Sequence, residues 1–403
     1  MQTENKSYYG WVVWFVSALF YLYEFLLRVS PSVMASELMQ TLDLTAFGLG
    51  SMTAFYFYSY AALQIPVGYI ADRIGPKLPV VIACIVCIIF SFLISKAHTV
   101  WVFKLCYFMI GCGSAFAFVS TLFLIHSWFP QRQFILLSGL TNFLGILGAI
   151  FAQKPLAIYI DSHGWRDAQV LISGIGCIIL VLLIVFIKNN NIKKDPVSIK
   201  SFNKIISKPV YWLLGLYVGC MHFTLAGFGA LWGASYMGIV FHETSVKAAA
   251  MASFLYFGSL LGSLFIGFVT KLFRTKTSAM CFISTVGVLS SLAFINIPDV
   301  KYLGETLIFI VGFSTSGFLL GYDVVGIITP KDLVGTASGF LNTILVGLSS
   351  LSVSLIGYFL VLGATSPHHY SSVDYRHAMI ALVVSFSIAL ITALYLQYKR
   401  IDK

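Results

Sequence analysis

Apolar windows long enough to cross a bilayer recur along almost the whole chain of 403 residues. A transmembrane helix needs about 20 consecutive, mostly apolar residues. Hydrophobic residues make up 59% of this sequence and charged residues 10%, whereas soluble domains carry about 25% charged residues. A water-soluble fold cannot hide this much apolar surface, so we expect an all-α polytopic membrane protein.

The windows predict twelve transmembrane helices, and one long polar segment at 188–208 separates the first six from the last six. We therefore expect an N-terminal bundle at 1–187, a basic cytoplasmic linker at 188–208 and a C-terminal bundle at 209–403. Binding of the linker to anionic lipid headgroups would be a minor additional role. The predicted spans are 10–34, 46–71, 78–96, 101–127, 133–158, 168–187, 211–239, 246–270, 277–296, 303–328, 334–362 and 376–398.

The net charge of +10 is not the signature of a nucleic-acid partner, because Lys and Arg residues concentrate in alternate loops. With twelve spans and both termini in the cytoplasm, 17 of the 25 Lys and Arg residues lie in cytoplasmic segments and 5 in outer loops. This bias predicts that both termini are cytoplasmic. The remaining three, Arg28, Lys104 and Lys154, lie in predicted spans.

No motif in the sequence indicates an enzyme or a cofactor. All seven cysteines fall inside predicted spans, and the pair Cys84 and Cys87 favours apolar packing over a metal or redox site. There is no phosphate-binding loop, catalytic triad or metal-ligand constellation.

The turn between the second and third spans, Gly68-Tyr-Ile-Ala-Asp-Arg-Ile-Gly-Pro-Lys77, is the most specific motif. Its pattern G-x-x-A-D-R-x-G-x-K resembles the loop between helices 2 and 3 of the major facilitator superfamily of transporters. The start of the eleventh span, Gly335-Thr-Ala-Ser-Gly339, is also similar to that family. The resemblance covers essentially the whole chain and implies two pseudo-symmetric six-helix bundles that work by alternating access.

The two halves also resemble each other. Residues 267–276 align with Gly68–Lys77, and Tyr211-Trp212 mirrors Gly10-Trp11. Only the leading Gly and the closing Lys of the motif match, so the second copy is degenerate. The repeat favours two related bundles with the substrate site between them.

The resemblance implies a gating role for the helix 2–3 motif, namely for Gly68, Asp72, Arg73, Gly75 and Lys77. In the superfamily the residue that matches Asp72 contacts the start of helix 11 in the outward-facing state. An acidic side chain is stabilised at a helix N-terminus by the helix dipole. The alternative is that Arg73 and Lys77 act only as topology signals.

The first span carries a pair of opposite charges, Glu24 and Arg28, one helical turn apart. Charges inside a span normally face a cavity or a partner. Arg28 is a candidate fork for a substrate carboxylate or phosphate, and Glu24 a candidate site for a proton or a substrate amine. The alternative is an internal ion pair that fixes the helix. Tyr21 and Tyr23 either donate hydrogen bonds at this site or pack in the core.

Two further candidates for substrate contact, Tyr107 and Asn142, lie in the first half. Tyr107 stands where many proton-coupled family members carry an Arg, which puts the usual proton relay in doubt. Lys104, one turn away, either replaces that charge or extends its ammonium group toward the outer surface. Asn142 in the fifth span is a candidate cavity residue.

Two candidates lie in the second half. His222 is a candidate proton carrier and substrate contact, unless a neighbouring backbone group satisfies it. Asp323 is a candidate proton site if its carboxylate is buried and unpaired. The alternative for Asp323 is capping or pairing near the inner rim of the bundle.

Together these features predict a secondary transporter for a small carboxylate-bearing solute such as an amino acid, short peptide or organic acid. Arg28 would anchor the solute, and Glu24 and Asp323 would couple it to protons in symport. We expect a monomer in the bilayer of a bacterial inner membrane. The alternatives are a multidrug or siderophore exporter of the same fold and, less favoured, a non-transporting sensor.

Overall fold

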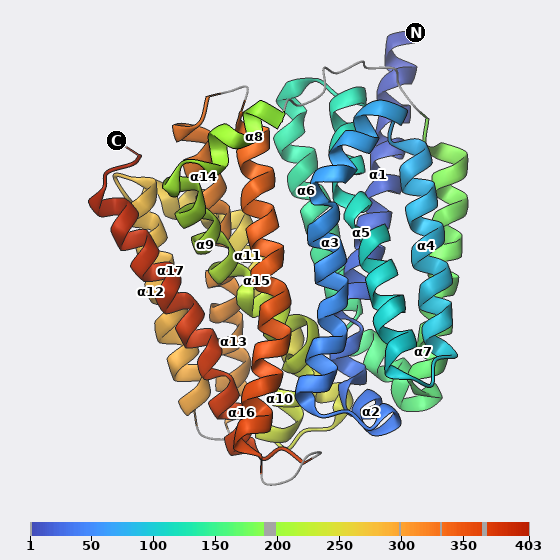
Figure 1. The fold of residues 1–403 in the computed structure, drawn as a ribbon, viewed down its shortest axis with the longest axis vertical. Helices are drawn as coiled ribbons and strands as arrows, with labels where there is room; N and C mark the ends of the chain where they lie inside the picture. The colour runs from blue at the N-terminus through green and yellow to red at the C-terminus, as the bar shows by residue number, and fades with distance from the viewer. Residues whose placement is uncertain (1, 189–198, 298–299, 331–332, 365–368, 403) are drawn as a thin grey trace. The chain divides into compact units, whose positions relative to one another are not determined.

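The computed structural model describes residues 2–188, 199–297, 300–330, 333–364 and 369–402. Side chains are described for these ranges except at 2–7, 65, 68, 69, 71–73, 131, 135, 199–202 and 301. The described chain is helical and contains no β-strand element, which confirms the predicted all-α class (Figure 1).

Helices follow one another with short connections along the described chain. The first half contains α1 (Gln2–Val29), α2 (Pro31–Leu42), α3 (Ala46–Ile74), α4 (Lys77–Ser95), α5 (Val100–Trp128), α6 (Gln131–Phe151) and α7 (Lys154–Phe186). The second half contains α8 (Ile199–Ile206), α9 (Pro209–Thr224), the π-helix η1 (Leu225–Trp232), α10 (Gly233–Val240), α11 (Ser245–Lys271), α12 (Lys276–Asn296), α13 (Lys301–Thr315), α14 (Phe318–Ile328), α15 (Val334–Gly363), α16 (Ser372–Ala378) and α17 (Ile380–Tyr398).

Ten stretches of the described chain are long and apolar enough to cross a membrane. One of them, Arg132–Phe186, holds two spans, because the backbone turns at Gly164 with a φ of 80°. Helix α3 adds a further segment of 29 residues. Counted in this way, the described residues contain the twelve spans that the hydropathy pattern predicts.

The chain divides into two compact units. Unit 1 comprises Met1–Pro31 and Phe55–Pro196, and unit 2 comprises Ser32–Ala54 and Val197–Lys403. The boundary at Pro196 falls in the predicted linker, whose residues 189–198 lie outside the described part of the chain. Two features were not expected: α2 and the start of α3 group with unit 2, and the linker region contains the short helix α8.

In unit 1, glycines bring α1 and α3 close to their neighbours. A Cβ atom at Gly148 of α6 would lie 2.1 Å from the carbonyl oxygen of Leu22 in α1. A Cβ atom at Gly111 of α5 would lie 2.2 Å from the carbonyl oxygen of Tyr56 in α3. Small residues allow this close backbone approach between membrane helices. These contacts fix the positions of α1, which carries the two charged residues of the first span, and of α3.

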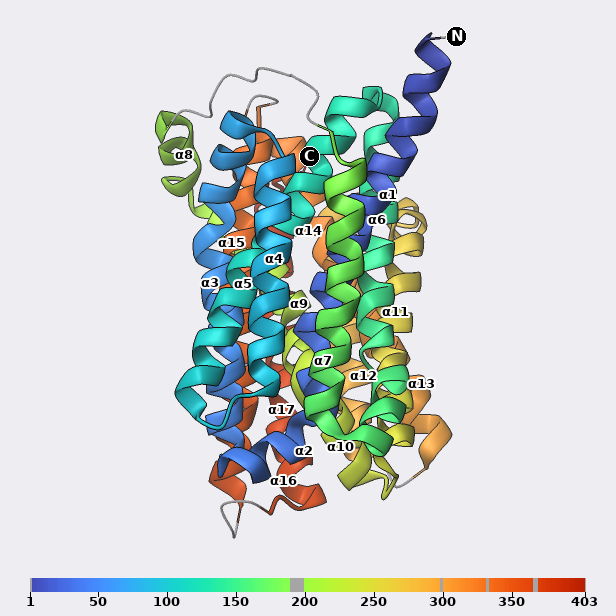
Figure 2. The same ribbon diagram turned by 90° about the vertical axis from the view of Figure 1, so that its right-hand side faces the viewer.

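In unit 2, α9 packs against α15 and α17. Helix α11 packs against α13, and both lie at the right of Figure 2. Helix α12 lies between α13 and α17. The π-helix η1 continues α9, and the indole Nε1–H of Trp232 at its end donates to the carbonyl of Val353 in α15 at 2.9 Å. This bond ties the irregular segment to a long regular helix.

The internal repeat has a structural counterpart in two arginines. Arg166 Nη1 donates to the carbonyls of Ser95 and Ala97 at 2.8 and 3.0 Å, at the end of α4. Arg376 Nη1 donates to the carbonyls of Ile295 and Ile297 at 2.8 and 2.7 Å, at the end of α12. Each arginine therefore satisfies carbonyls that the end of a helix leaves without partners. The same contact occurs once in each unit.

Gly148→Ala tests the close approach of α1 and α6. The added methyl group has no room beside Leu22, so we expect a loss of roughly 1–3 kcal/mol in stability and a lower melting temperature. Gly139→Ala in the same helix is the matched control, because a Cβ atom there meets nothing within 4 Å. Equal melting temperatures for the two variants in detergent would contradict this packing.

Candidate functional site

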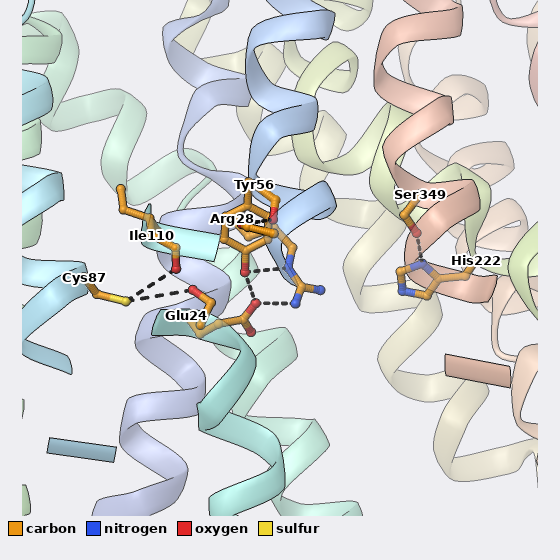
Figure 3. A network of polar contacts seen from close by, with 9 residues as sticks. Glu24, Arg28, Tyr56, Cys87, Ile110, His222 and Ser349 are labelled. Carbon is orange, nitrogen blue, oxygen red and sulfur yellow. Dashed lines mark hydrogen bonds and ion pairs between the residues drawn. The ribbon is translucent and has the colours of Figure 1, made fainter. Parts of the chain in front are cut away.

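Three side chains of unit 1 form a closed polar network, which we call the charge cluster: Glu24, Arg28 and Tyr56 (Figure 3). Arg28 Nη2 donates to Glu24 Oε1 in the ion pair that the one-turn spacing predicts. The hydroxyl of Tyr56, from α3, donates to the same carboxylate oxygen. That hydroxyl also accepts a hydrogen bond from Arg28 Nε at 3.3 Å. The cluster therefore joins two helices.

Burial makes the carboxylate of the charge cluster dependent on its partners. The side chain of Glu24 is 0% exposed and that of Arg28 is 12% exposed. Glu24 Oε2 is buried and has no hydrogen-bond partner among the described residues. A buried charge is costly unless it is paired and hydrogen-bonded. The free oxygen is thus a natural position for a proton, and protonation would weaken the hold of Glu24 on both of its donors.

The guanidinium of Arg28 has additional support from aromatic rings. Its central carbon lies 4.4 Å from the ring centroid of Phe25, 5.3 Å from that of Tyr60 and 5.6 Å from that of Tyr56. A cation over an aromatic face is stabilised by the ring quadrupole. The positive charge can therefore persist when Glu24 is neutral. A guanidinium carries five N–H groups, and Glu24 and Tyr56 take one each.

Sequence reasoning missed the contributions of Tyr56, Tyr60 and Phe25. The available signal was the aromatic run from Phe55 to Tyr60, but the run alone does not say which ring faces α1. The structure resolves this by burial: Tyr56 is 2% exposed and Tyr60 6%, whereas Tyr58 is 45% exposed.

The two tyrosines predicted beside the charged pair lie in packed surroundings. Tyr21 contacts Phe25 and the ring of Phe118 on α5, with centroids 5.1 and 5.0 Å away. Tyr23 is fully buried and points toward α7, where a Cβ atom at Gly176 would lie 2.6 Å from its hydroxyl. Tyr56 supplies the hydroxyl that bonds Glu24 in the charge cluster, so the packing alternative is favoured for Tyr23.

The other predicted residues of unit 1 lie outside the charge cluster. Tyr107 is buried and stacks on Phe103, with ring centroids 6.4 Å apart. Lys104 Nζ lies 4.8 Å from the ring of Trp101 and 5.4 Å from that of Phe55. Asn142 is half-buried on α6. Lys104 is thus held by aromatic rings near the start of α5, and the transport roles of Tyr107 and Asn142 are still predictions.

The predicted gating motif is described in part. Gly75 has a φ of 77° and makes the turn between α3 and α4, a conformation that favours glycine. Lys77 Nζ donates to the carbonyl of Ile184 at 2.9 Å, near the negative end of the α7 dipole. The side chains of Asp72 and Arg73 and the surroundings of Gly68 lie outside the described part of the structure. The gating role is still a prediction.

In unit 2, the structure gives partners to both predicted titratable residues. His222 Nδ1 lies 3.1 Å from the hydroxyl oxygen of Ser349 on α15. Asp323 is exposed and accepts a hydrogen bond from Lys276 Nζ at 3.0 Å. The structure therefore shows Asp323 exposed and paired, as in the pairing alternative, and a proton-coupling role for Asp323 is still a prediction. Among the described residues no cluster of three His, Cys, Asp or Glu side chains could hold a metal ion.

Comparison with known proteins connects this geometry to a family. The family model described as Major Facilitator Superfamily matches residues 13–354. A bacterial homologue of the human lysosomal transporter Spinster, in an inward-facing and occupied conformation, has the same fold with a TM-score of 0.81 at 17% identity. That alignment covers 97% of this chain and 98% of the homologue.

The names of two curated relatives include organic acids. The probable galactarate/D-glucarate transporter of Bacillus subtilis is 22% identical over 421 residues, which cover 95% of this chain and 92% of the relative. The probable sulfoacetate transporter of Cupriavidus necator is 25% identical over 190 residues, 47% of this chain. This match spans 44% of the sulfoacetate transporter, less than half of its length.

Arg28→Leu tests the dependence of Glu24 on its counter-charge. Removal of the guanidinium leaves a fully buried carboxylate unpaired, so we expect a loss of about 3–5 kcal/mol in stability. The double variant Glu24→Gln/Arg28→Leu should recover most of that loss, because no buried charge is left. Thermal unfolding in detergent micelles measures both of these variants and the single variant Glu24→Gln. Purely additive effects of the two substitutions would show that the ion pair does not stabilise unit 1.

Proposed function

The chain belongs to the major facilitator superfamily, and we propose that it is a secondary transporter for a small organic anion that carries a carboxylate. The observation that carries the proposal is the buried guanidinium of Arg28, held beside a carboxylate that a proton can neutralise. A planar guanidinium matches the two oxygens of a carboxylate. An ionisable residue inside a membrane bundle is a candidate functional site.

The relatives favour organic acids among the carboxylate-bearing solutes. Galactarate, D-glucarate and sulfoacetate, named for two relatives, are all small anions. Each combines a carboxylate with further polar groups and lacks the amine of an amino acid. We therefore place sugar acids and related organic acids ahead of amino acids and short peptides as solutes for this chain.

The charge balance of the cluster supports proton coupling as part of this proposal. With Glu24 ionised, its charge cancels that of Arg28, and an incoming anion would have to compete with a buried carboxylate. With Glu24 protonated, the guanidinium is left to attract the anion. Proton and solute would then bind together and cross together as symport. Asp323 has no place in this scheme, because it is exposed and paired with Lys276.

The orientation of the chain is part of the proposal. The excess of Lys and Arg in alternate loops supports cytoplasmic termini and a bacterial inner membrane. In that setting an inward proton gradient would drive uptake of the anion.

Thermal stabilisation by a matched solute series tests this function. Sorbitol, D-gluconate and D-glucarate share a six-carbon polyhydroxy chain and carry no, one and two carboxylates. A solute that binds only the folded protein raises its melting temperature by mass action. We expect D-gluconate or D-glucarate to stabilise the wild type, sorbitol to have no effect, and the double variant Glu24→Gln/Arg28→Leu to lose the response.

Lys154→Gln is the control for removal of a positive charge elsewhere in unit 1, since Lys154 is exposed on α7. It should respond to the solutes as the wild type does. Stabilisation only by a lipophilic cation such as tetraphenylphosphonium, equal in all variants, would overturn the proposal and favour a multidrug exporter.

A further inference from the structure

We propose that Tyr56 is a hydrogen-bond donor shared between Glu24 and the transported anion. In the absence of solute its hydroxyl serves the ionised Glu24 carboxylate, and after Glu24 is protonated it serves the carboxylate of the bound solute. The inference rests on the proposed function and adds a binding residue from a second helix, α3.

Both hydrogen bonds to the Glu24 carboxylate are made to one of its two oxygens. Glu24 Oε1 accepts hydrogen bonds from both Arg28 Nη2 and the Tyr56 hydroxyl, while Oε2 accepts none among the described residues. Arg28 and Tyr56 thus form a two-donor receptor for one carboxylate oxygen. In the described state, Glu24 occupies this receptor as an internal carboxylate. A solute carboxylate has the same acceptor chemistry and needs the same two donors.

The chemistry of a phenol makes the two carboxylates exclude each other. A tyrosine hydroxyl has a single proton and donates it to one acceptor at a time. Transfer of this donor to the solute leaves ionised Glu24 with a buried oxygen that has lost a partner, which is costly. A proton on Glu24 removes that cost, because the neutral carboxyl group needs fewer donors. No covalent bond other than the O–H bond on Glu24 forms in this exchange.

The surroundings of Tyr56 hold its ring in place for both partners. The backbone carbonyl of Tyr56 lies so close to Gly111 of α5 that a Cβ atom at Gly111 would clash with it. Its ring is stacked with that of Tyr60, with centroids 6.0 Å apart and planes 24° apart. The ring of Tyr56 is therefore held in place, and a rotation of its hydroxyl hydrogen is enough to redirect the donor.

Charge balance then limits the receptor to one carboxylate. The charge cluster is neutral with ionised Glu24 and no solute. It is neutral again with protonated Glu24 and one bound carboxylate. A second carboxylate, as in D-glucarate, would have to find its counter-charge elsewhere.

Binding of D-gluconate in a Glu24→Gln background tests the shared donor directly. Without the Glu24 carboxylate, Tyr56→Phe removes the donor to the solute and the weak acceptor of Arg28 Nε, whose bond is 3.3 Å long. Loss of one hydrogen bond to a charged group should weaken binding about tenfold or more. Glu24→Gln/Tyr58→Phe is the matched control, because Tyr58 lies two residues away on the exposed side of α3. Equilibrium binding of radiolabelled D-gluconate to purified protein measures the three variants.

The outcomes separate this inference from the proposed function. Weaker binding in the Tyr56→Phe variant alone supports the shared donor. Equal D-gluconate affinity for the Tyr56→Phe and Tyr58→Phe variants overturns it and leaves the proposed function intact. If neither the wild type nor Glu24→Gln binds D-gluconate or D-glucarate, the proposed function itself fails.

A second measurement covers the case in which the double variant does not fold. Tyr56→Phe in the wild-type background removes a donor that favours ionised Glu24, so D-gluconate binding should persist to higher pH. The charged and titratable neighbours of Glu24 that could contribute are Arg28 of α1, Tyr56 and Tyr60 of α3, and Cys87 of α4. Tyr58→Phe is again the control, and an identical pH profile for both variants would refute the inference.

Discussion

A fully buried carboxylate inside an apolar helical unit is the constraint on which this account depends. Glu24 has no exposed surface and is held by a guanidinium and a phenol through a single oxygen. Such a group is stable only while its charge is balanced, either by Arg28 or by a proton. In the proposed mechanism, alternation between these two balances would allow a carboxylate-bearing solute to exchange places with an internal one.

Arginines in this protein serve two physically distinct purposes. Arg166 and Arg376 each donate to two backbone carbonyls at a helix end, and they secure the helical frame of their units. Arg28 instead bonds two side chains that can change partners, and aromatic rings support its charge. The first kind of contact is a fixed part of the fold. The second kind is suited to binding, since its partner can be replaced by a ligand of the same chemistry.

The sequence predicted what depends on local spacing and failed where distant residues meet. Hydropathy is read from consecutive residues, so the helical class and the twelve spans are confirmed, and a four-residue spacing correctly paired Glu24 with Arg28. Tyr56 was missed because its role depends on how α3 packs against α1. The alternatives for Asp323 stayed open because its partner, Lys276, lies 47 positions away in the sequence. In both cases tertiary packing, which a single sequence does not display, decided the outcome.

The most direct test of the central claim is proton movement during transport of D-gluconate by the reconstituted protein. Proteoliposomes with a trapped pH indicator and an inward D-gluconate gradient should acidify inside, with about one proton per D-gluconate because the charge cluster exchanges one for the other. Glu24→Gln should exchange D-gluconate across the membrane without moving protons. D-gluconate flux through the wild type with no change in internal pH would contradict the claim that a proton on Glu24 makes room for the solute.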